Sequence, residues 1–352
     1  MRFCHPANPP ARSRPRAESW RAALAAGGAA ALLLTACAAL RPFAEVRREQ
    51  PDNRFVEVDG RQVYVEQQGA GDPVVLLHGF GESSYTWRRV MPELARSFRV
   101  VAPDLNGFGW TERPHDPQSY TPLGQERLVL GVLAALGIGR AQFVGHSYGG
   151  SLTLFLASRH PELVRAMVLV DSAAPTYAED RRSRLAALRP LDQLFVRLAL
   201  RPRRIRGSLL ASVYDPAVVT PALVRAYLDR LRVEGEVDAY YGLTAPLPRP
   251  AAGAAAAGGG VKLERIAVPA LVVWGAEDRL IRVEAGRRAA GKLPAGEFVT
   301  IPRAGHLPME ERPAELLGLM VPFLKRHAEA GGTASLAPGA SASSPRVPRG
   351  RG

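Results

Sequence analysis

The segment from residue 143 to residue 150, Phe-Val-Gly-His-Ser-Tyr-Gly-Gly, constrains the fold of this chain more than any other feature. An apolar run at 141–144 precedes Ser147 and a helix-forming run at 151–159 follows it, so a strand must turn sharply into a helix. The glycines two residues before and after the serine remove Cβ atoms that would clash in so tight a turn. The pattern predicts a strained, exposed serine with its Oγ above the edge of a sheet.

Short apolar runs alternate with helical patterns along most of the chain. The runs lie at 74–77, 99–102, 141–144, 166–170, 270–274 and 297–301, and the helical patterns at 85–96, 123–136, 151–159 and 283–290. Residues 55–58 and 62–67 alternate apolar and polar side chains, which predicts an antiparallel hairpin turning at Asp59-Gly60. Alternating strands and helices predict a parallel sheet with helices on both faces.

The alternation stops between about residues 176 and 260, where Leu, Arg, Ala and Tyr occur at helical spacing. This segment ends in an Ala/Gly-rich stretch that is typical of a linker. We therefore expect a helical lid with a linker at 176–260, inserted between two parts of the sheet domain, at 54–175 and 261–329. The tail at 330–352, rich in Ala, Gly, Ser and Pro, is predicted to be disordered.

The N-terminal residues have the composition of an export signal. An arginine-rich start precedes an uncharged Ala/Leu-rich run, which is too short for a transmembrane helix of about 20 residues. The end of this run, Leu34-Thr35-Ala36-Cys37, resembles the lipobox of bacterial lipoproteins. The resemblance implies a signal peptide at 1–36 and a lipid on Cys37, followed by a polar tether at 37–53 and anchorage to a membrane of the cell envelope. A secretory signal cut after Ala38, giving a soluble exported protein, and an uncleaved anchor are the alternatives.

The net charge of +13 raises the question of nucleic-acid binding, but its distribution argues against it. The first 36 residues hold five arginines, and much of the remaining excess lies between residues 179 and 249. The most basic run, Arg201 to Arg206, contains no aromatic residue on which a base could stack. We expect this run to face solvent or a membrane.

Metal and disulfide chemistry find little support in the sequence. The chain has only two cysteines, Cys4 and Cys37, and the first would leave with the signal peptide. No group of His, Cys, Asp and Glu shows the spacing of metal ligands. We therefore predict neither a metal nor a cofactor.

A serine hydroxyl is a weak nucleophile unless a base activates it. Histidine suits this role at neutral pH. Among the seven histidines, His306 lies in a loop after the last apolar run, and so it is the predicted base. His78 lies in the turn before Gly79 and His146 lies in the serine turn, and we expect both to support the backbone.

The predicted acid that orients the histidine is Asp278, which follows the apolar run at 270–274. Asp278 lies between the serine and the histidine in the chain, which gives the order Ser, acid, His that this kind of site uses. Asp171, after the run at 166–170, is the alternative, and Glu277 is a weaker one.

An anionic intermediate also needs backbone N–H donors. The sequence His78-Gly79-Phe80-Gly81 follows the first long apolar run, and its glycines allow a close approach to the site. By position, the predicted donors are the N–H groups of Phe80 and Tyr148.

Together these motifs make the chain similar to α/β-hydrolases over roughly residues 54–326. The resemblance implies an eight-stranded, mostly parallel sheet flanked by helices, with an inserted helical lid. It also implies acyl transfer from a small ester-like substrate to Ser147 and then to water, with no cofactor. Related dehalogenases and epoxide hydrolases use an aspartate nucleophile, against which Ser147 argues. Carbon–carbon bond hydrolases and perhydrolases share the triad and remain alternatives, as does a non-catalytic binding protein on this scaffold.

Overall fold

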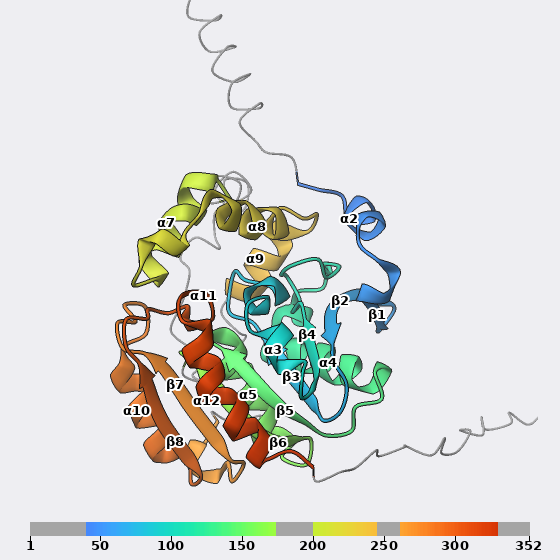
Figure 1. Ribbon diagram of the computed structural model, residues 1–352. Helices are drawn as coiled ribbons and strands as arrows, with labels where there is room; N and C mark the ends of the chain where they lie inside the picture. The colour runs from blue at the N-terminus through green and yellow to red at the C-terminus, as the bar shows by residue number, and fades with distance from the viewer. Residues whose placement is uncertain (1–39, 174–199, 245–260, 330–352) are drawn as a thin grey trace, which may run out of the picture. The chain divides into compact units, whose positions relative to one another are not determined.

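The computed structural model describes residues 40–173, 200–244 and 261–329 (Figure 1). Eight strands form one sheet in the order β1-β2-β4-β3-β5-β6-β7-β8. The first two pairs, β1 with β2 and β2 with β4, are antiparallel, and the other pairs are parallel. The predicted α/β-hydrolase architecture is confirmed in its sheet.

The strands lie where the apolar runs predict them, within two residues at either end. They are β1 (Phe55–Val58), β2 (Arg61–Gln68), β3 (Pro73–Leu77), β4 (Arg99–Pro103), β5 (Ala141–His146), β6 (Val164–Val170), β7 (Ala270–Gly275) and β8 (Gly296–Ile301). Asp59 and Gly60 both have positive φ, as a tight hairpin turn requires. Strands β5 and β7 are buried along their whole length, and each has a neighbouring strand on both sides.

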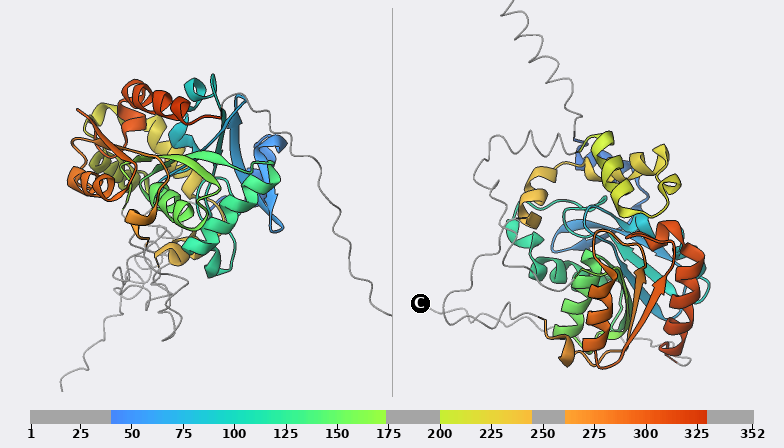
Figure 2. Two further views of the ribbon diagram at one scale, coloured as in Figure 1. Left: turned by 90° about the horizontal axis from the view of Figure 1, so that it is seen from below. Right: turned by 90° about the vertical axis from the view of Figure 1, so that its left-hand side faces the viewer.

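Helices cover both faces of the sheet, as the views in Figure 2 show. Helices α4 (Pro122–Ala135), α5 (Tyr148–Arg159) and α10 (Val283–Lys292) share one apolar core. Helices α3 (Met91–Leu94) and α12 (Pro313–Arg326) share the other, while α11 (Pro308–Glu311) follows β8. Alternate residues of β3 point into the two cores: Val75 and Leu77 into the first, Val74 and Leu76 into the second. This alternation explains the continuous apolar runs of the central strands.

Two expectations from the sequence are wrong. The pattern at 85–96 is not one helix but a 3-10 turn, η2 (Ser84–Trp87), followed by α3, where Pro92 lies in the first turn. A proline fits a helix start but not its interior. Residues 40–53 do not form a free tether, because helix α2 (Phe43–Glu49) buries Val46 against Tyr64 and Trp110.

The described part of the segment between β6 and β7, residues 200–244, is called the insertion here. It contains α7 (Pro202–Ser212), α8 (Pro221–Leu231) and α9 (Glu236–Thr244), in agreement with the predicted helices. The predicted signal peptide, Cys37, the Ala/Gly linker and the tail lie outside the described residues. Within the described ranges, no helix has both the length and the apolarity that crossing a membrane requires.

Candidate active site

Ser147 lies at the turn between β5 and α5 with φ of 48° and ψ of −111°. A positive φ is uncommon for a residue with a side chain and marks the predicted strain. A Cβ atom on Gly145 would lie 2.5 Å from the carbonyl oxygen of Gly149, and one on Gly149 would lie 2.2 Å from that of Leu77. Both positions therefore require glycine, which is the reason the sequence pattern is so specific.

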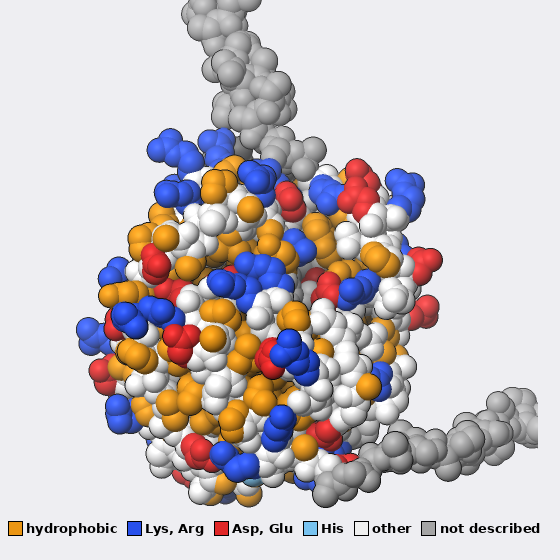
Figure 3. Space-filling view, in the orientation of Figure 1, with side chains coloured by type: hydrophobic (Ala, Val, Ile, Leu, Met, Phe, Trp, Pro, Cys, Tyr) orange, Lys and Arg blue, Asp and Glu red, His pale blue; other side chains and the backbone are white. Residues whose placement is uncertain are grey.

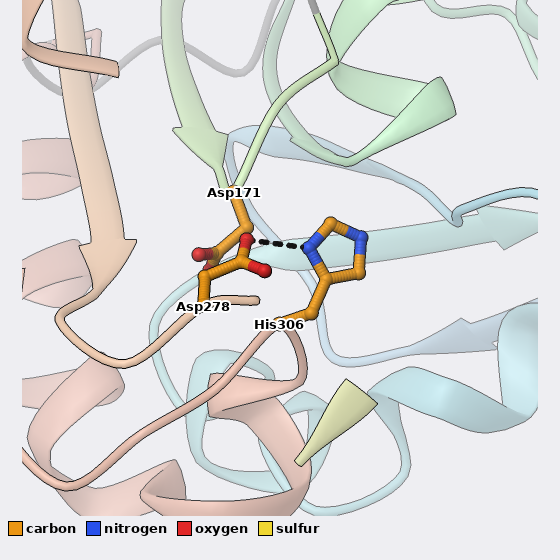
Figure 4. A group of neighbouring side chains, drawn as sticks. All are labelled: Asp171, Asp278 and His306. Atoms are coloured by element: carbon orange, nitrogen blue, oxygen red, sulfur yellow. Dashed lines mark hydrogen bonds and ion pairs between the residues drawn. The ribbon is translucent and has the colours of Figure 1, made fainter. Parts of the chain in front are cut away.

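The predicted base and acid meet beyond the ends of β7 and β8. The Nδ1 atom of His306 lies 2.7 Å from Oδ2 of Asp278, and both side chains are buried (Figure 4). The other carboxylate oxygen, Oδ1, accepts hydrogen bonds from the N–H groups of Leu280 (2.8 Å) and Ile281 (3.1 Å). Burial raises the pKa of Asp278, but its hydrogen bonds and the charge of His306 prevail and lower it below its ordinary value. Asp278 is thus a carboxylate fixed in one orientation.

Asp171, the alternative acid, lies beside this pair but does not contact the imidazole (Figure 4). Its Oδ1 accepts a hydrogen bond from the N–H of Gly275 at 2.9 Å, and its Oδ2 is buried without a partner among the described residues. Burial, and next the charge of Asp278, raise the pKa of Asp171 well above its ordinary value. A neutral carboxyl at this place can donate a hydrogen bond but cannot stabilise an imidazolium by charge.

Among the described residues, these same three side chains are the group that could hold a metal ion, with ligand atoms within 4.8 Å of one another. One ligand atom on each side chain is already engaged, because Nδ1 of His306 contacts Asp278 and Oδ1 of Asp171 accepts a hydrogen bond from a backbone N–H. The raised pKa of Asp171 also disfavours the charged form that a cation needs. The arrangement therefore suits proton transfer better than metal binding.

His146 connects the serine turn to the loops that flank it. Its Nε2 lies 2.8 Å from the carbonyl oxygen of His306, and its Nδ1 lies 3.1 Å from Oε2 of Glu82. The same oxygen of Glu82 accepts a hydrogen bond from the N–H of Gly79 at 2.9 Å. Burial lowers the pKa of His146, but Glu82 outweighs it and raises that pKa above its ordinary value, which favours a charged imidazole beside the carboxylate. The predicted supporting role of His146 agrees with this geometry.

Glu82 was not among the residues predicted from the sequence. A carboxylate three residues after Gly79 in a turn was the available signal, because it can accept a hydrogen bond from a nearby backbone N–H group. Its partner His146 is 64 residues away in the chain.

The two predicted oxyanion donors come from neighbouring segments. The rings of Phe80 and Tyr148 lie 6.5 Å apart, and both pack against Phe108. No described residue accepts a hydrogen bond from the backbone N–H of either residue. Two such N–H groups beside a strained serine are what stabilisation of an oxyanion requires.

Asp104 braces the loop after β4 through hydrogen bonds to backbone N–H groups. Its Oδ1 accepts a hydrogen bond from the N–H of Ser84 (2.6 Å), and its Oδ2 from that of Trp110 (2.7 Å). His78 contributes from the other side, because its Nε2 accepts from the N–H of Leu105 at 3.0 Å. These bonds place Phe108 against the two residues that carry the predicted oxyanion donors.

Comparison with known proteins gives the family. Residues 72–207 match the profile of the alpha/beta hydrolase fold. The 2-hydroxymuconate semialdehyde hydrolase of Pseudomonas sp. (strain CF600) is 32% identical over 291 residues, which cover 77% of this chain and 93% of that protein.

Solved structures agree with this assignment. A serine hydrolase involved in carbazole degradation is 27% identical with a TM-score of 0.63, over 78% of this chain and 98% of its own. A membrane phospholipase A described as a bacterial virulence factor is 26% identical with a TM-score of 0.61, over 87% and 96% of the two chains. The chain belongs to the α/β-hydrolase fold family and is a hydrolase.

Proposed function

We propose that this hydrolase cleaves an ester-like bond of a small molecule through Ser147, His306 and Asp278. The observation that carries the proposal is the 2.7 Å contact between His306 Nδ1 and Asp278 Oδ2, made from the ends of two strands in the same sheet as the serine turn. This contact directs Nε2 of the imidazole away from the carboxylate, as a base for a serine requires.

The mechanism begins with proton transfer from Ser147 Oγ to His306 as the oxygen attacks the substrate carbonyl. Asp278 holds the imidazole in the required tautomer and stabilises its charged form. The N–H groups of Phe80 and Tyr148 stabilise the oxyanion, the protonated histidine releases the leaving group, and water then cleaves the acyl-enzyme. The ion pair of His146 and Glu82 supports this step, because it ties the backbone of His306 to the loop that carries Phe80.

A second candidate reaction is hydrolysis of a carbon–carbon bond. Several relatives at about 30% identity are named 2-hydroxymuconate semialdehyde hydrolase or 2-hydroxy-6-oxo-2,4-heptadienoate hydrolase. The same three residues serve such chemistry, since the bond that breaks also lies next to a carbonyl carbon. The relatives' names favour this candidate, whereas the site geometry is common to both reactions.

A substrate panel tests the proposal. The protein lacking residues 1–37 is assayed against p-nitrophenyl esters of graded chain length and, in parallel, against 2-hydroxymuconate semialdehyde. We expect ester hydrolysis that disappears in Ser147→Ala, with kcat/KM highest for one chain length. Turnover of the semialdehyde at a kcat/KM far above that for every ester would replace the ester proposal with the second candidate. Turnover that persists in Ser147→Ala would contradict both.

A further inference from the structure

The outer face of α7 is strongly basic. Arg203, Arg204 and Arg206 in this helix, and Arg201 at its N-cap, are exposed, and the helix contains no acidic residue. None of the four forms an ion pair with a described residue, whereas many other arginines of the chain do. Figure 3 shows Lys and Arg side chains gathered over this part of the insertion.

The opposite side of α7 is fixed in the protein. Leu209 is buried and joins the core that includes α12, and Ile205 packs against both this core and a small cluster of leucines. Because the apolar residues face inward, the arginines must face outward together. Their arrangement is therefore a stable surface of the fold.

The chain enters the fold beside this basic face. Leu40 packs against the leucine cluster that Ile205 also contacts, formed by Leu200, Leu228 and Leu231. Its neighbour Arg41 is held by two backbone hydrogen bonds of 2.8 Å, one to the carbonyl of Arg232 and one from the N–H of Glu234. The N-terminal entry point is thus bound to the insertion.

Cys37, with its lipobox-like sequence, precedes Leu40 by only three residues. Three residues span at most about 11 Å. If Cys37 carries the lipid that its sequence predicts, that lipid is attached within this distance of Leu40. The charge of α7 fits an anionic membrane surface whether or not the cysteine is lipidated.

We propose that the basic face of α7, formed by Arg201, Arg203, Arg204 and Arg206, docks on an anionic lipid membrane. A basic residue near such a surface raises partitioning by about fivefold, so a group of four gives substantial attraction. The basic face supplies a contact with the membrane surface in addition to any lipid on Cys37. Nucleic acid fits less well, because the run lacks aromatic residues for base stacking. The proposal does not depend on which bond the hydrolase cleaves.

Vesicle binding tests the proposal. The described residues, which begin at Leu40, all belong to one compact unit, so the protein lacking residues 1–37 is suitable and removes any contribution of a lipid or of the apolar run. Its partitioning is measured by co-sedimentation with vesicles of phosphatidylcholine, with and without phosphatidylglycerol, at low and high salt. We expect binding only to the anionic vesicles, and loss of that binding at high salt.

The decisive variant is R203E/R204E/R206E, and its matched control is R127E/R265E/R288E. The control residues are exposed, lie on α4, near β7 and on α10, and make no ion pair with a described residue. We expect at least tenfold weaker partitioning for the α7 variant and less than threefold for the control. Unchanged hydrolysis of a soluble ester, or of 2-hydroxymuconate semialdehyde if that is the substrate, shows that each variant is folded. If the reversal unfolds the protein, R203Q/R204Q/R206Q replaces it, with the same expected direction.

Two results would overturn the proposal. One is equal binding to neutral and anionic vesicles. The other is an equal loss of binding in the α7 variant and the control, which would indicate attraction to the net charge of the chain and not to this face.

Discussion

The serine site and the junction between the insertion and the sheet domain both contain buried charged pairs, but they satisfy them differently. Asp278 accepts two backbone N–H groups in addition to its contact with His306. At the junction, Nη2 of Arg113 lies 3.1 Å from Oε2 of Glu236, which belongs to α9. The geometry of this contact is not that of a hydrogen bond, and Nε and Nη1 of the arginine and Oε2 of the glutamate have no hydrogen-bond partner among the described residues. One pair is fully held in place and the other is not.

The difference reflects how the two regions are built. At the serine site, the loop between β7 and α10 supplies two backbone donors, so the fold itself prevents the carboxylate from turning. At the junction, side chains of a helix and a loop meet without backbone donors, and burial raises the pKa of Glu236 to about 7 despite the charge of Arg113. We infer that the serine site is rigid, whereas the junction changes its protonation near neutral pH.

The largest expected effect comes from breaking the well-held pair. Asp278→Asn should lower kcat by about 10⁴, because an amide donates to Nδ1 of His306 and selects the wrong tautomer. The measurement is kcat on the best substrate of the panel.

Asp171→Asn is the matched control for that change. Since the raised pKa favours the neutral form of Asp171, an amide should replace its carboxyl group and leave kcat within about tenfold. A large loss in this variant and a small one in Asp278→Asn would make Asp171 the triad acid.

The next effect concerns the junction pair of Arg113 and Glu236. Below its ordinary pKa of 4.5, Glu236 is protonated in both the folded and the unfolded chain. Between pH 4.5 and 7 only the folded chain keeps the proton, so this group's contribution to stability is lost as the pH rises. The wild type should lose up to about 3 kcal/mol of unfolding free energy between pH 4.5 and 8, relative to Glu236→Gln. Urea unfolding of both proteins at the two pH values measures this difference, and parallel pH profiles would refute the raised pKa.

The last prediction compares a glycine of the serine turn with a glycine of the insertion. Ala at position 149 would place its Cβ 2.2 Å from the carbonyl oxygen of Leu77, so Gly149→Ala should destabilise the fold by about 3 kcal/mol. Gly207 lies in α7, where a Cβ atom would have no neighbouring atom within 4 Å, and Gly207→Ala should stabilise by about 0.5 to 1 kcal/mol. Thermal unfolding distinguishes the two, and equal effects would remove the contrast between a tightly packed turn and an open helix face.

The sequence predicted the sheet well because its strands are buried on both faces and so appear as uninterrupted apolar runs. It also predicted Ser147, Asp278 and His306 as a group, since each follows such a run. It did not predict contacts between distant segments, such as Glu82 with His146 or Arg113 with Glu236, because the two partners of each pair lie far apart in the chain. Helix α2 was missed for the same reason: its one buried residue, Val46, gains its partners only from β2, the loop after β4 and the insertion.

The central claim is that Ser147 is the activated nucleophile, and labelling with a fluorophosphonate probe tests it most directly. Peptide mass mapping should find the adduct on Ser147 in the folded protein, and Ser147→Ala should remain unlabelled. Labelling should also slow strongly in Asp278→Asn and only slightly in Asp171→Asn, in parallel with kcat. Folded, active protein that stays unlabelled, or that carries the adduct on another residue, would contradict the account.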